Sequence, residues 1–150
     1  MTTVTYRRPG TVTRRVLNPF VARLTKLGIS VAGSRVLRVR GRMSGQWRET
    51  PVNLLTHEGE HYLVAPRGIT NWVRNLRADD QGQLQLGRRT QNFQGTEVTG
   101  TDRLVVLQAY LRRWKWEVGA FFGGVGPDSS ATELAAIADS HPVFRVRLQA

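Results

Sequence analysis

Along most of this chain, apolar and polar residues alternate in short runs. In the last such run, Phe144, Val146 and Leu148 occupy every second position, with arginines between them. This period of two places one face of a strand in a core and the other in water. Residues that favour turns separate the runs, as in the hairpin signal over 57–60. The pattern predicts strands over Arg35–Arg40, Thr50–Thr56, His61–Ala65, Gly82–Arg88, Gln91–Val98 and Val143–Leu148, with a tight turn near Arg89-Thr90.

Helical periodicity appears in other segments. Near the N-terminus, Val16, Phe20, Leu24 and Leu27 recur at spacings of four, four and three, which is an apolar stripe on one face of a helix. Further along, Thr101-Asp102 is a helix start signal in front of a long apolar stripe. The predicted helices cover residues 13–27, residues 71–78, a long segment from Thr101, and a short segment around Ala131–Asp139.

Several strands with few, scattered helices indicate an α+β domain whose antiparallel sheet is closed or half-closed into a barrel. Strands joined by hairpins do not suit a doubly wound parallel sheet, so the usual dinucleotide-binding fold is not expected. No internal repeat and no linker rich in proline or glycine divides the chain. Residues 1–150 are therefore expected to form a single domain.

Composition narrows the possible chemistry. The chain has no cysteine, which removes disulfides, thiolate nucleophiles and Cys-based metal sites. The histidines His57, His61 and His141 lack the spacing of metal ligands on a helix, so no metal site is expected. There is no run of eighteen apolar residues and no visible secretory signal. These features favour a cytoplasmic protein.

The net charge of +11 is concentrated in the first third of the chain. Residues 1–50 carry eleven Lys or Arg against one acid, Glu49. Such a concentration attracts a polyanion, which is a nucleic acid, an anionic membrane surface or a highly charged small molecule. The aromatic residues of this third are too scattered for a stacking platform, so nucleic acid is not expected. The helix predicted over residues 13–27 suits either peripheral contact with the inner face of the membrane or packing on the barrel.

One loop has the parts of an anion site. In RGRMSGQWRETPV, Arg40 to Val52, arginines gather around small residues between two predicted strands. Gly41 and Gly45 allow backbone N–H groups to approach an anion, and Ser44 adds a hydroxyl donor. Arg42 and Arg48 can supply forked, permanently charged contacts to phosphate oxygens. On these residues alone, a solvated basic loop is an equal alternative.

Three blocks in the same order strengthen the interpretation of this loop as an anion site. GRMSGQWRETPV, EHYLVAPRG and NWVRNLRA together resemble the deazaflavin-dependent nitroreductase family, over about Val36 to Leu86 and weakly again in HPVFRVRL. The resemblance implies an antiparallel split β-barrel, FMN-binding-like, with a few flanking helices. It implies coenzyme F-420, an 8-hydroxy-5-deazaflavin with a phosphodiester and an acidic tail, as cofactor. The implied activity is hydride transfer from the reduced deazaflavin to a quinone-like or nitro-containing small molecule.

The resemblance also implies which residues bind the cofactor. The residues that would meet the phosphate are Arg42, Met43, Ser44 and Arg48. Those that would line the ribityl chain and the ring edge are Glu49, Thr50, Pro51, Val52 and Asn53. The wall beside the ring would consist of Val64, Ala65, Pro66, Arg67 and Gly68, and the pocket would be closed by Asn71, Trp72, Val73 and Asn75.

Several alternatives remain open from the sequence. Met43 stands where the family commonly has lysine, which leaves FMN as an alternative cofactor. A protein that stores the cofactor or binds polyanions without catalysis is another alternative, and the assembly is a monomer or a homodimer. Among the later aromatic residues, Tyr110 and Trp114 are expected in the core, and Trp116 or Phe121 at the border of the pocket. No catalytic residue is assigned.

Overall fold

A computed structural model of the chain describes residues 33–149, with the side chains of residues 115–120 left out. The helix predicted over residues 13–27, with its suggested membrane contact, lies outside the described residues. The side chain of Trp116 also lies outside them, so its expected place at a pocket border has no structural counterpart here.

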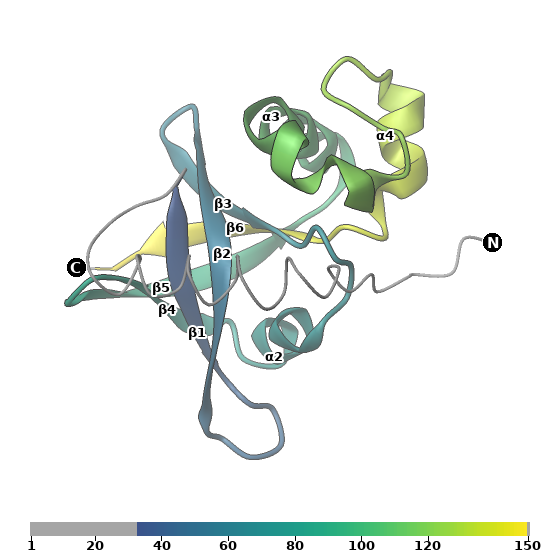
Figure 1. Ribbon diagram of the computed structural model, residues 1–150. Coiled ribbons are helices and arrows are strands. Elements are labelled where there is room, and N and C mark those ends of the chain that lie inside the picture. Colours follow the sequence, from purple (N-terminus) through teal and green to yellow (C-terminus); the bar gives the residue numbers. More distant parts are fainter. Residues whose placement is uncertain (1–32, 150) are drawn as a thin grey trace.

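Six strands in the described part of the chain form one antiparallel barrel (Figure 1). Their order around the barrel is β1-β2-β3-β6-β5-β4, and pairing of β4 with β1 closes it. This confirms the antiparallel barrel and the α+β class expected from the alternating runs. The strands are β1 Ser34–Arg40, β2 Trp47–His57, β3 Glu60–Val64, β4 Gln81–Leu86, β5 Arg89–Val98 and β6 Val143–Leu148.

Strand β2 belongs to two hairpins. Its first part, Trp47–Asn53, pairs with β1, and its second part, Leu54–His57, pairs with β3. The sequence-based start at Thr50 was therefore three residues late, because Arg48-Glu49 shows no apolar alternation. The predicted turn near Arg89-Thr90 was also wrong. The chain reverses at Gly87-Arg88, where Gly87 takes a positive φ of 62° that favours glycine.

The barrel interior is filled by alternate residues of the strands. Leu37, Phe93 and Phe144 are almost completely buried there, in one apolar cluster. Helix α2 (Asn71–Ala78) closes one end of the barrel, since Val73 and Leu76 belong to the same cluster. The predicted boundaries of this helix, residues 71–78, are confirmed. Helix α2 therefore closes this end of the barrel with apolar side chains, and it also borders the candidate site.

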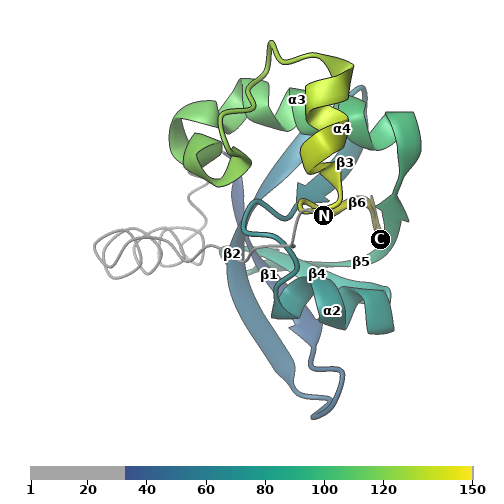
Figure 2. The same ribbon diagram turned by 90° about the vertical axis from the view of Figure 1, so that its right-hand side faces the viewer.

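A second apolar cluster lies outside the barrel wall. Helix α3 (Gly100–Val118), the short 3-10 helix η2 (Gly119–Phe122) and helix α4 (Ala131–Ala138) cover this side, opposite α2 (Figure 2). Tyr110 and Trp114 are buried here with ring centroids 5.0 Å apart, which confirms them as core residues. Ser130 and Glu133 form a capping box that starts α4.

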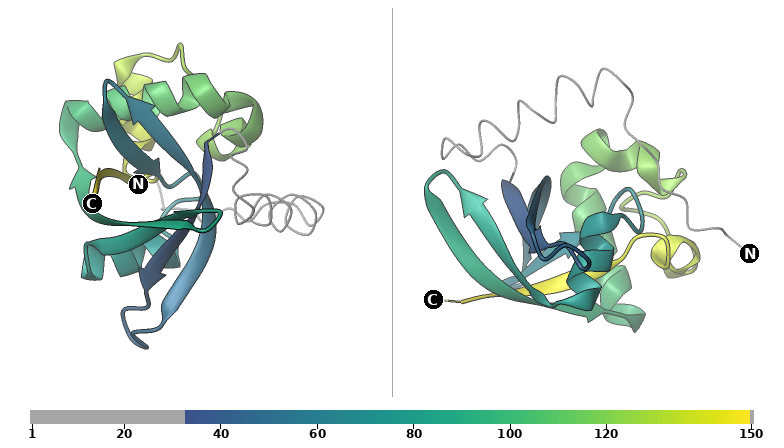
Figure 3. Two further views of the ribbon diagram at one scale, coloured as in Figure 1. Left: turned by 90° about the vertical axis from the view of Figure 1, so that its left-hand side faces the viewer. Right: turned by 90° about the horizontal axis from the view of Figure 1, so that it is seen from below.

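Antiparallel pairing gives the barrel two chemically different ends. At one end lie α2 and the β1–β2 loop. At the other lie the start of β1, the end of β6 and the β4–β5 turn, which projects away from α2 (Figure 3). Seven residues of β1 separate the two ends, or about 20 Å at roughly 3.3 Å per residue.

Candidate functional site

The β1–β2 loop is a compact turn held by its own backbone. The N–H of Gly41 donates to the carbonyl of Gln46 at 2.7 Å, and the N–H of Gly45 donates to the carbonyl of Gly41 at 2.9 Å. Gly45 has a φ of 71°, which favours glycine. The N–H groups of Gly41 and Gly45 are therefore both used inside the turn. The side chains of Arg42, Ser44 and Arg48 are further donors in and beside this loop.

Asn75 of α2 anchors this loop. Its side-chain oxygen accepts a hydrogen bond from the backbone N–H of Arg42 at 3.0 Å and another from the Arg42 guanidinium at 2.8 Å. Asn75 is only 4% exposed, whereas Arg42 is on the surface. The structure thus brings together two residues of the predicted set that lie 33 positions apart. Asn75 positions the arginine rather than facing solvent itself.

The side chains of Ser44 and Arg48 lie close to the bare Cα of Gly41. A Cβ built at Gly41 would lie 2.7 Å from the Ser44 hydroxyl oxygen, 3.5 Å from the Gln46 carbonyl oxygen and 3.7 Å from the Arg48 Nε. Among the described residues, the Arg48 side chain has no hydrogen-bond or ion-pair partner. Hydroxyl and guanidinium donors around a bare glycine suit a phosphate oxygen. Arg42, Ser44 and Arg48 therefore have the donors that the binding of a cofactor phosphate, expected from the sequence, requires.

Met43 is the fourth residue that was predicted to meet the phosphate, and it is 92% exposed at the tip of the loop. A thioether is a weak acceptor with no donor, so the Met43 side chain offers nothing to a phosphate. This position is therefore a natural site for a test of the loop's charge.

The segment Glu49–Asn53 is divided between two faces of β2. Val52 and Leu54 pack toward the barrel interior, while Leu55 belongs to the outer cluster. By alternation, Glu49 faces outward. There it pairs with Arg38 at 3.3 Å, and the Arg38 and Arg40 guanidinium groups stack on Trp47. The Glu49 side chain therefore lies on the outer face of β2, beside Arg38.

The segment Val64–Gly68, expected to form the wall beside the cofactor ring, begins at the last residue of β3 and is hydrogen-bonded to the segment before β6. The N–H of Ala65 donates to the carbonyl of Pro142 at 2.9 Å, and the Nδ1 of His141 lies 3.2 Å from the carbonyl of Ala65. Because a carbonyl only accepts, this ring nitrogen carries the proton. Sequence reasoning missed this role of His141, which depends on the pairing of β3 with β6.

The remaining residues of the predicted set differ in accessibility. Val64 and Ala65 are buried, and Val73 is fully buried in the barrel cluster, so these side chains are core residues. Asn71 is exposed at the start of α2, and Trp72 is half-buried against Phe144, with ring centroids 5.9 Å apart. Pro66 and Arg67 are also half-buried, and Gly68 has a positive φ of 92°. Phe121, expected at the pocket border, is half-buried against the outer cluster.

No group of three or more histidine, cysteine or carboxylate residues in residues 33–149 is arranged to hold a metal ion. In the same range, no helix is long and apolar enough to cross a membrane.

Comparison with known proteins places the chain among cofactor-dependent reductases. A family model described as F-420H(2)-dependent quinone reductase matches residues 12–116, which is more than half of the chain. No curated protein sequence matches significantly.

Solved structures agree on the fold. An F-420-H2-dependent reductase (FDR-A) has a TM-score of 0.55 at 17% identity, covering 77% of this chain and 94% of that chain. A protein described as a domain-swapped dimer has a TM-score of 0.58 at 16% identity, covering 93% and 100%. A putative pyridoxamine 5′-phosphate oxidase from Listeria innocua has a TM-score of 0.54 at 9% identity, covering 79% and 85%. At these identities, the likeness concerns the barrel fold alone.

Proposed function

The chain belongs to the family of F-420H(2)-dependent quinone reductases, whose cofactor is coenzyme F-420, and from this membership we propose that it transfers a hydride from the reduced cofactor to a quinone-like or nitro-containing acceptor. The family makes the protein an F-420-dependent oxidoreductase with a small-molecule acceptor. The identity of the acceptor and the residues that bind the cofactor are the proposed part.

The observation that carries the binding proposal is the convergence of side-chain donors beside Gly41. The Ser44 hydroxyl and the Arg48 Nε both lie close to this residue, and Arg42 lies on the same loop. The Arg48 side chain has no ion-pair partner among the described residues, so an anion that binds there displaces no ion pair. We therefore assign the cofactor's phosphate to Arg42, Ser44 and Arg48.

The rest of the cofactor is assigned to the elements around this loop. Main chain of Glu49–Asn53 would run beside the ribityl chain and the ring edge, and the segment Val64–Gly68 would form the wall next to the ring. Asn71 and Trp72 of α2 are the accessible side chains on the remaining side. His141 and Pro142 hold the wall at Ala65, which keeps its backbone in one position.

The cofactor, when bound, supplies the hydride, so the protein needs no catalytic triad. The contribution of this chain is to hold the phosphate, orient the ring against the Ala65 wall, and leave the acceptor an accessible side. The acidic tail of the cofactor meets a strongly basic chain, since residues 1–50 carry eleven Lys or Arg against one acid.

The test is a pair of titrations of the whole chain, one with oxidised F-420 and one with FMN, followed by cofactor fluorescence at low and moderate salt. We expect F-420 to bind more tightly, with affinity that falls as salt rises. Arg42→Ala and Arg48→Ala should each weaken binding about tenfold or more, at about 1–3 kcal/mol per charge-assisted hydrogen bond.

The matched control is Arg88→Ala, which removes an exposed arginine from the β4–β5 turn. It should leave F-420 affinity unchanged. Equal losses for Arg42, Arg48 and Arg88 would reject the loop as the binding site, and FMN binding alone would change the cofactor. Turnover of bound reduced F-420 with a soluble quinone and with a nitroaromatic compound then distinguishes the acceptor classes. Binding without turnover would favour a carrier of the cofactor.

The proposal also includes one domain, a cytoplasmic location and peripheral contact of residues 13–27 with an anionic membrane. The support is sequence alone, namely the apolar stripe and basic residues of that segment. Co-sedimentation of the whole chain with anionic and with neutral vesicles tests it. Binding to neither type of vesicle would reject the membrane contact and leave the reductase proposal intact.

A further inference from the structure

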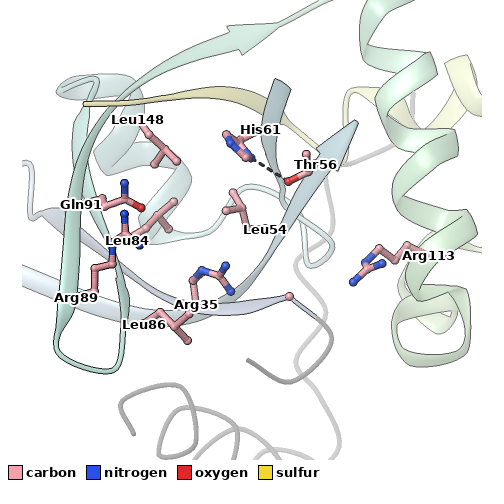
Figure 4. Close-up of a pocket in the computed structure, with 11 residues that line it drawn as sticks. Arg35, Leu54, Thr56, His61, Leu84, Leu86, Arg89, Gln91, Arg113 and Leu148 are labelled. Carbon is pink, nitrogen blue, oxygen red and sulfur yellow. Dashed lines mark hydrogen bonds between the residues drawn. The ribbon is translucent and has the colours of Figure 1, made fainter. Parts of the chain in front are cut away.

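A cavity opens at the end of the barrel opposite α2. Its volume is about 560 Å³, which lies within the range of roughly 300–1,000 Å³ typical of small-molecule sites. Residues from all six strands line it, together with Arg113 of α3 (Figure 4). It lies about 20 Å along β1 from Gly41. The cavity is thus a different place from the proposed cofactor site.

The cavity exists because the inward-facing residues at this end of the barrel do not fill the interior with large apolar side chains. In β1, Leu37 and Val39 belong to the interior cluster, and Arg35 takes the next inward position. In β2 and β3, the corresponding inward residues are Thr56 and His61, which are paired across the strands. Polar side chains in this layer replace the large apolar groups that fill the layer below.

The lining combines two kinds of side chain. The apolar ones are Leu54, Leu84, Leu86 and Leu148. The cationic and polar ones lie among them, and Figure 4 shows Arg35 on the side of β1, with Arg89 and Gln91 on another side of the cavity. The Thr56 hydroxyl and the His61 Nδ1 lie 2.9 Å apart across β2 and β3.

The charges of the lining are all of one sign. Arg35, Arg89 and Arg113 border the cavity, and no acidic residue is among the described residues that line it. Burial lowers the pKa of Arg35 from its ordinary value, but an arginine remains charged at neutral pH. Like charges around one hollow repel each other and favour an anion between them.

We propose that this barrel-end cavity is a second binding site, for an anionic amphiphile whose apolar body lies against the leucines and whose carboxylate or phosphate head lies beside Arg35 and Arg89. The apolar lining does not suit a fully hydrophilic anion, and the arginines do not suit a neutral hydrocarbon. The proposal does not depend on F-420 binding at the β1–β2 loop.

The test uses a matched series of probes with one eight-carbon chain and different heads: octanoate, octyl phosphate, octanol and octyltrimethylammonium. Isothermal titration calorimetry on the whole chain measures each affinity below the concentration at which the probe aggregates. We expect octanoate and octyl phosphate to bind at least tenfold more tightly than octanol, with no binding of the cation. The ratio between the two anions identifies the preferred head group.

Arg89→Gln and its neighbour Arg88→Gln form a matched pair of variants. Both positions are exposed near the β4–β5 turn, but only Arg89 lines the cavity. Arg89→Gln should weaken binding of the anionic probes at least fivefold without changing octanol, and Arg88→Gln should change neither. Leu148→Gln should weaken both anionic probes and octanol, and its folding can be checked by thermal unfolding.

Four results would overturn the proposal. The first is equal affinity for octanol and the anions, and the second is the same loss from Arg88→Gln as from Arg89→Gln. The third is no binding of any probe by the folded chain. Loss of anion binding in Arg42→Ala would also overturn it, because it would place the probe in the β1–β2 loop. A saturating concentration of F-420 should leave the affinity for octyl phosphate unchanged.

Discussion

The side-chain oxygen of Asn75 accepts two hydrogen bonds from Arg42, one from the backbone N–H at 3.0 Å and one from the guanidinium at 2.8 Å. One buried amide therefore fixes both the backbone of the loop and the direction of its first arginine. The bond couples the stability of the β1–β2 loop to helix α2.

Replacing Asn75 by alanine should lower both stability and cofactor affinity. The substitution removes both hydrogen bonds of a buried side chain, and we expect a loss of about 1–3 kcal/mol in the free energy of unfolding. Urea unfolding measures that loss, and F-420 titration measures the accompanying loss of affinity. Asn75→Asp is the informative partner. It keeps the acceptor for Arg42, so stability should largely persist, but its negative charge should still weaken binding of the anionic cofactor.

If Asn75→Asp bound F-420 as well as the original chain, Arg42 would not be a contact of the phosphate. If Asn75→Ala left affinity unchanged while stability fell, Asn75 would serve folding only.

Gly41→Ala should weaken F-420 binding with little change in stability. Gly41 does not have a positive φ, so its backbone accepts alanine, but the new Cβ would lie 2.7 Å from the Ser44 oxygen and displace the hydroxyl that we assign to the phosphate. We expect a loss of affinity of about tenfold, or roughly 1.4 kcal/mol, measured by fluorescence titration. In the double variant Gly41→Ala, Ser44→Ala the contact is relieved but the hydroxyl is absent, so affinity should not recover. Recovery would show that the Ser44 hydroxyl does not bind the phosphate.

Met43→Lys should strengthen F-420 binding. Met43 is 92% exposed beside Arg42 and Ser44, so a lysine there adds a mobile positive charge without disturbing packing. We expect a gain of a few fold at low salt, about 0.5–1 kcal/mol, which decreases as salt rises. Met43→Gln, of similar length and without charge, is the control and should bind as the original chain does. A gain from glutamine equal to that from lysine would exclude charge as its cause.

Gly82→Ala should destabilise the barrel without acting on the site. A Cβ at Gly82 would lie 2.6 Å from the edge of the Phe93 ring and 3.1 Å from the Arg38 carbonyl oxygen. We expect the free energy of unfolding to fall by about 1–3 kcal/mol, the usual result of overpacking a core. Phe93→Leu in the same chain should restore part of the loss, although it costs stability alone. Additive losses in the double variant would argue against direct contact as the cause.

The ion pair between Arg77 and Glu97 should contribute little. Arg77 donates from Nε and from a terminal nitrogen to the two Glu97 oxygens at 2.8 and 2.7 Å, joining α2 to β5. The hydrogen bond to Glu97 raises the pKa of Arg77, so the arginine stays charged wherever the protein is folded. Both side chains are partly exposed, and we expect Arg77→Met to cost about 0.5–1 kcal/mol in urea unfolding. The F-420 affinity of Arg77→Met should be unchanged, since Arg77 is not part of the β1–β2 loop.

Much of the fold was predictable because its signals are local. The alternation in Val143–Leu148 and the helical spacing in Asn71–Ala78 each describe one element and need no distant partner. The β1–β2 loop was recognisable for the same reason, since its arginines, serine and glycines are neighbours in the sequence. The β4–β5 turn was misplaced by two residues because Arg88 and Arg89 look alike in a pattern of polarity alone.

Within residues 33–149, the sequence by itself therefore determined most strand and helix positions, and it also determined the basic loop and the family to which the chain belongs. Only the tertiary structure decided which side chains meet. Strand register and the docking of α2 brought Asn75 to Arg42, His141 to Ala65 and the Phe93 ring over Gly82. Closure of the barrel and the packing of α3 brought Arg35, Arg89 and Arg113 to the lining of one cavity. A local pattern sets the face on which a residue lies, but the pairing of distant strands sets its neighbours.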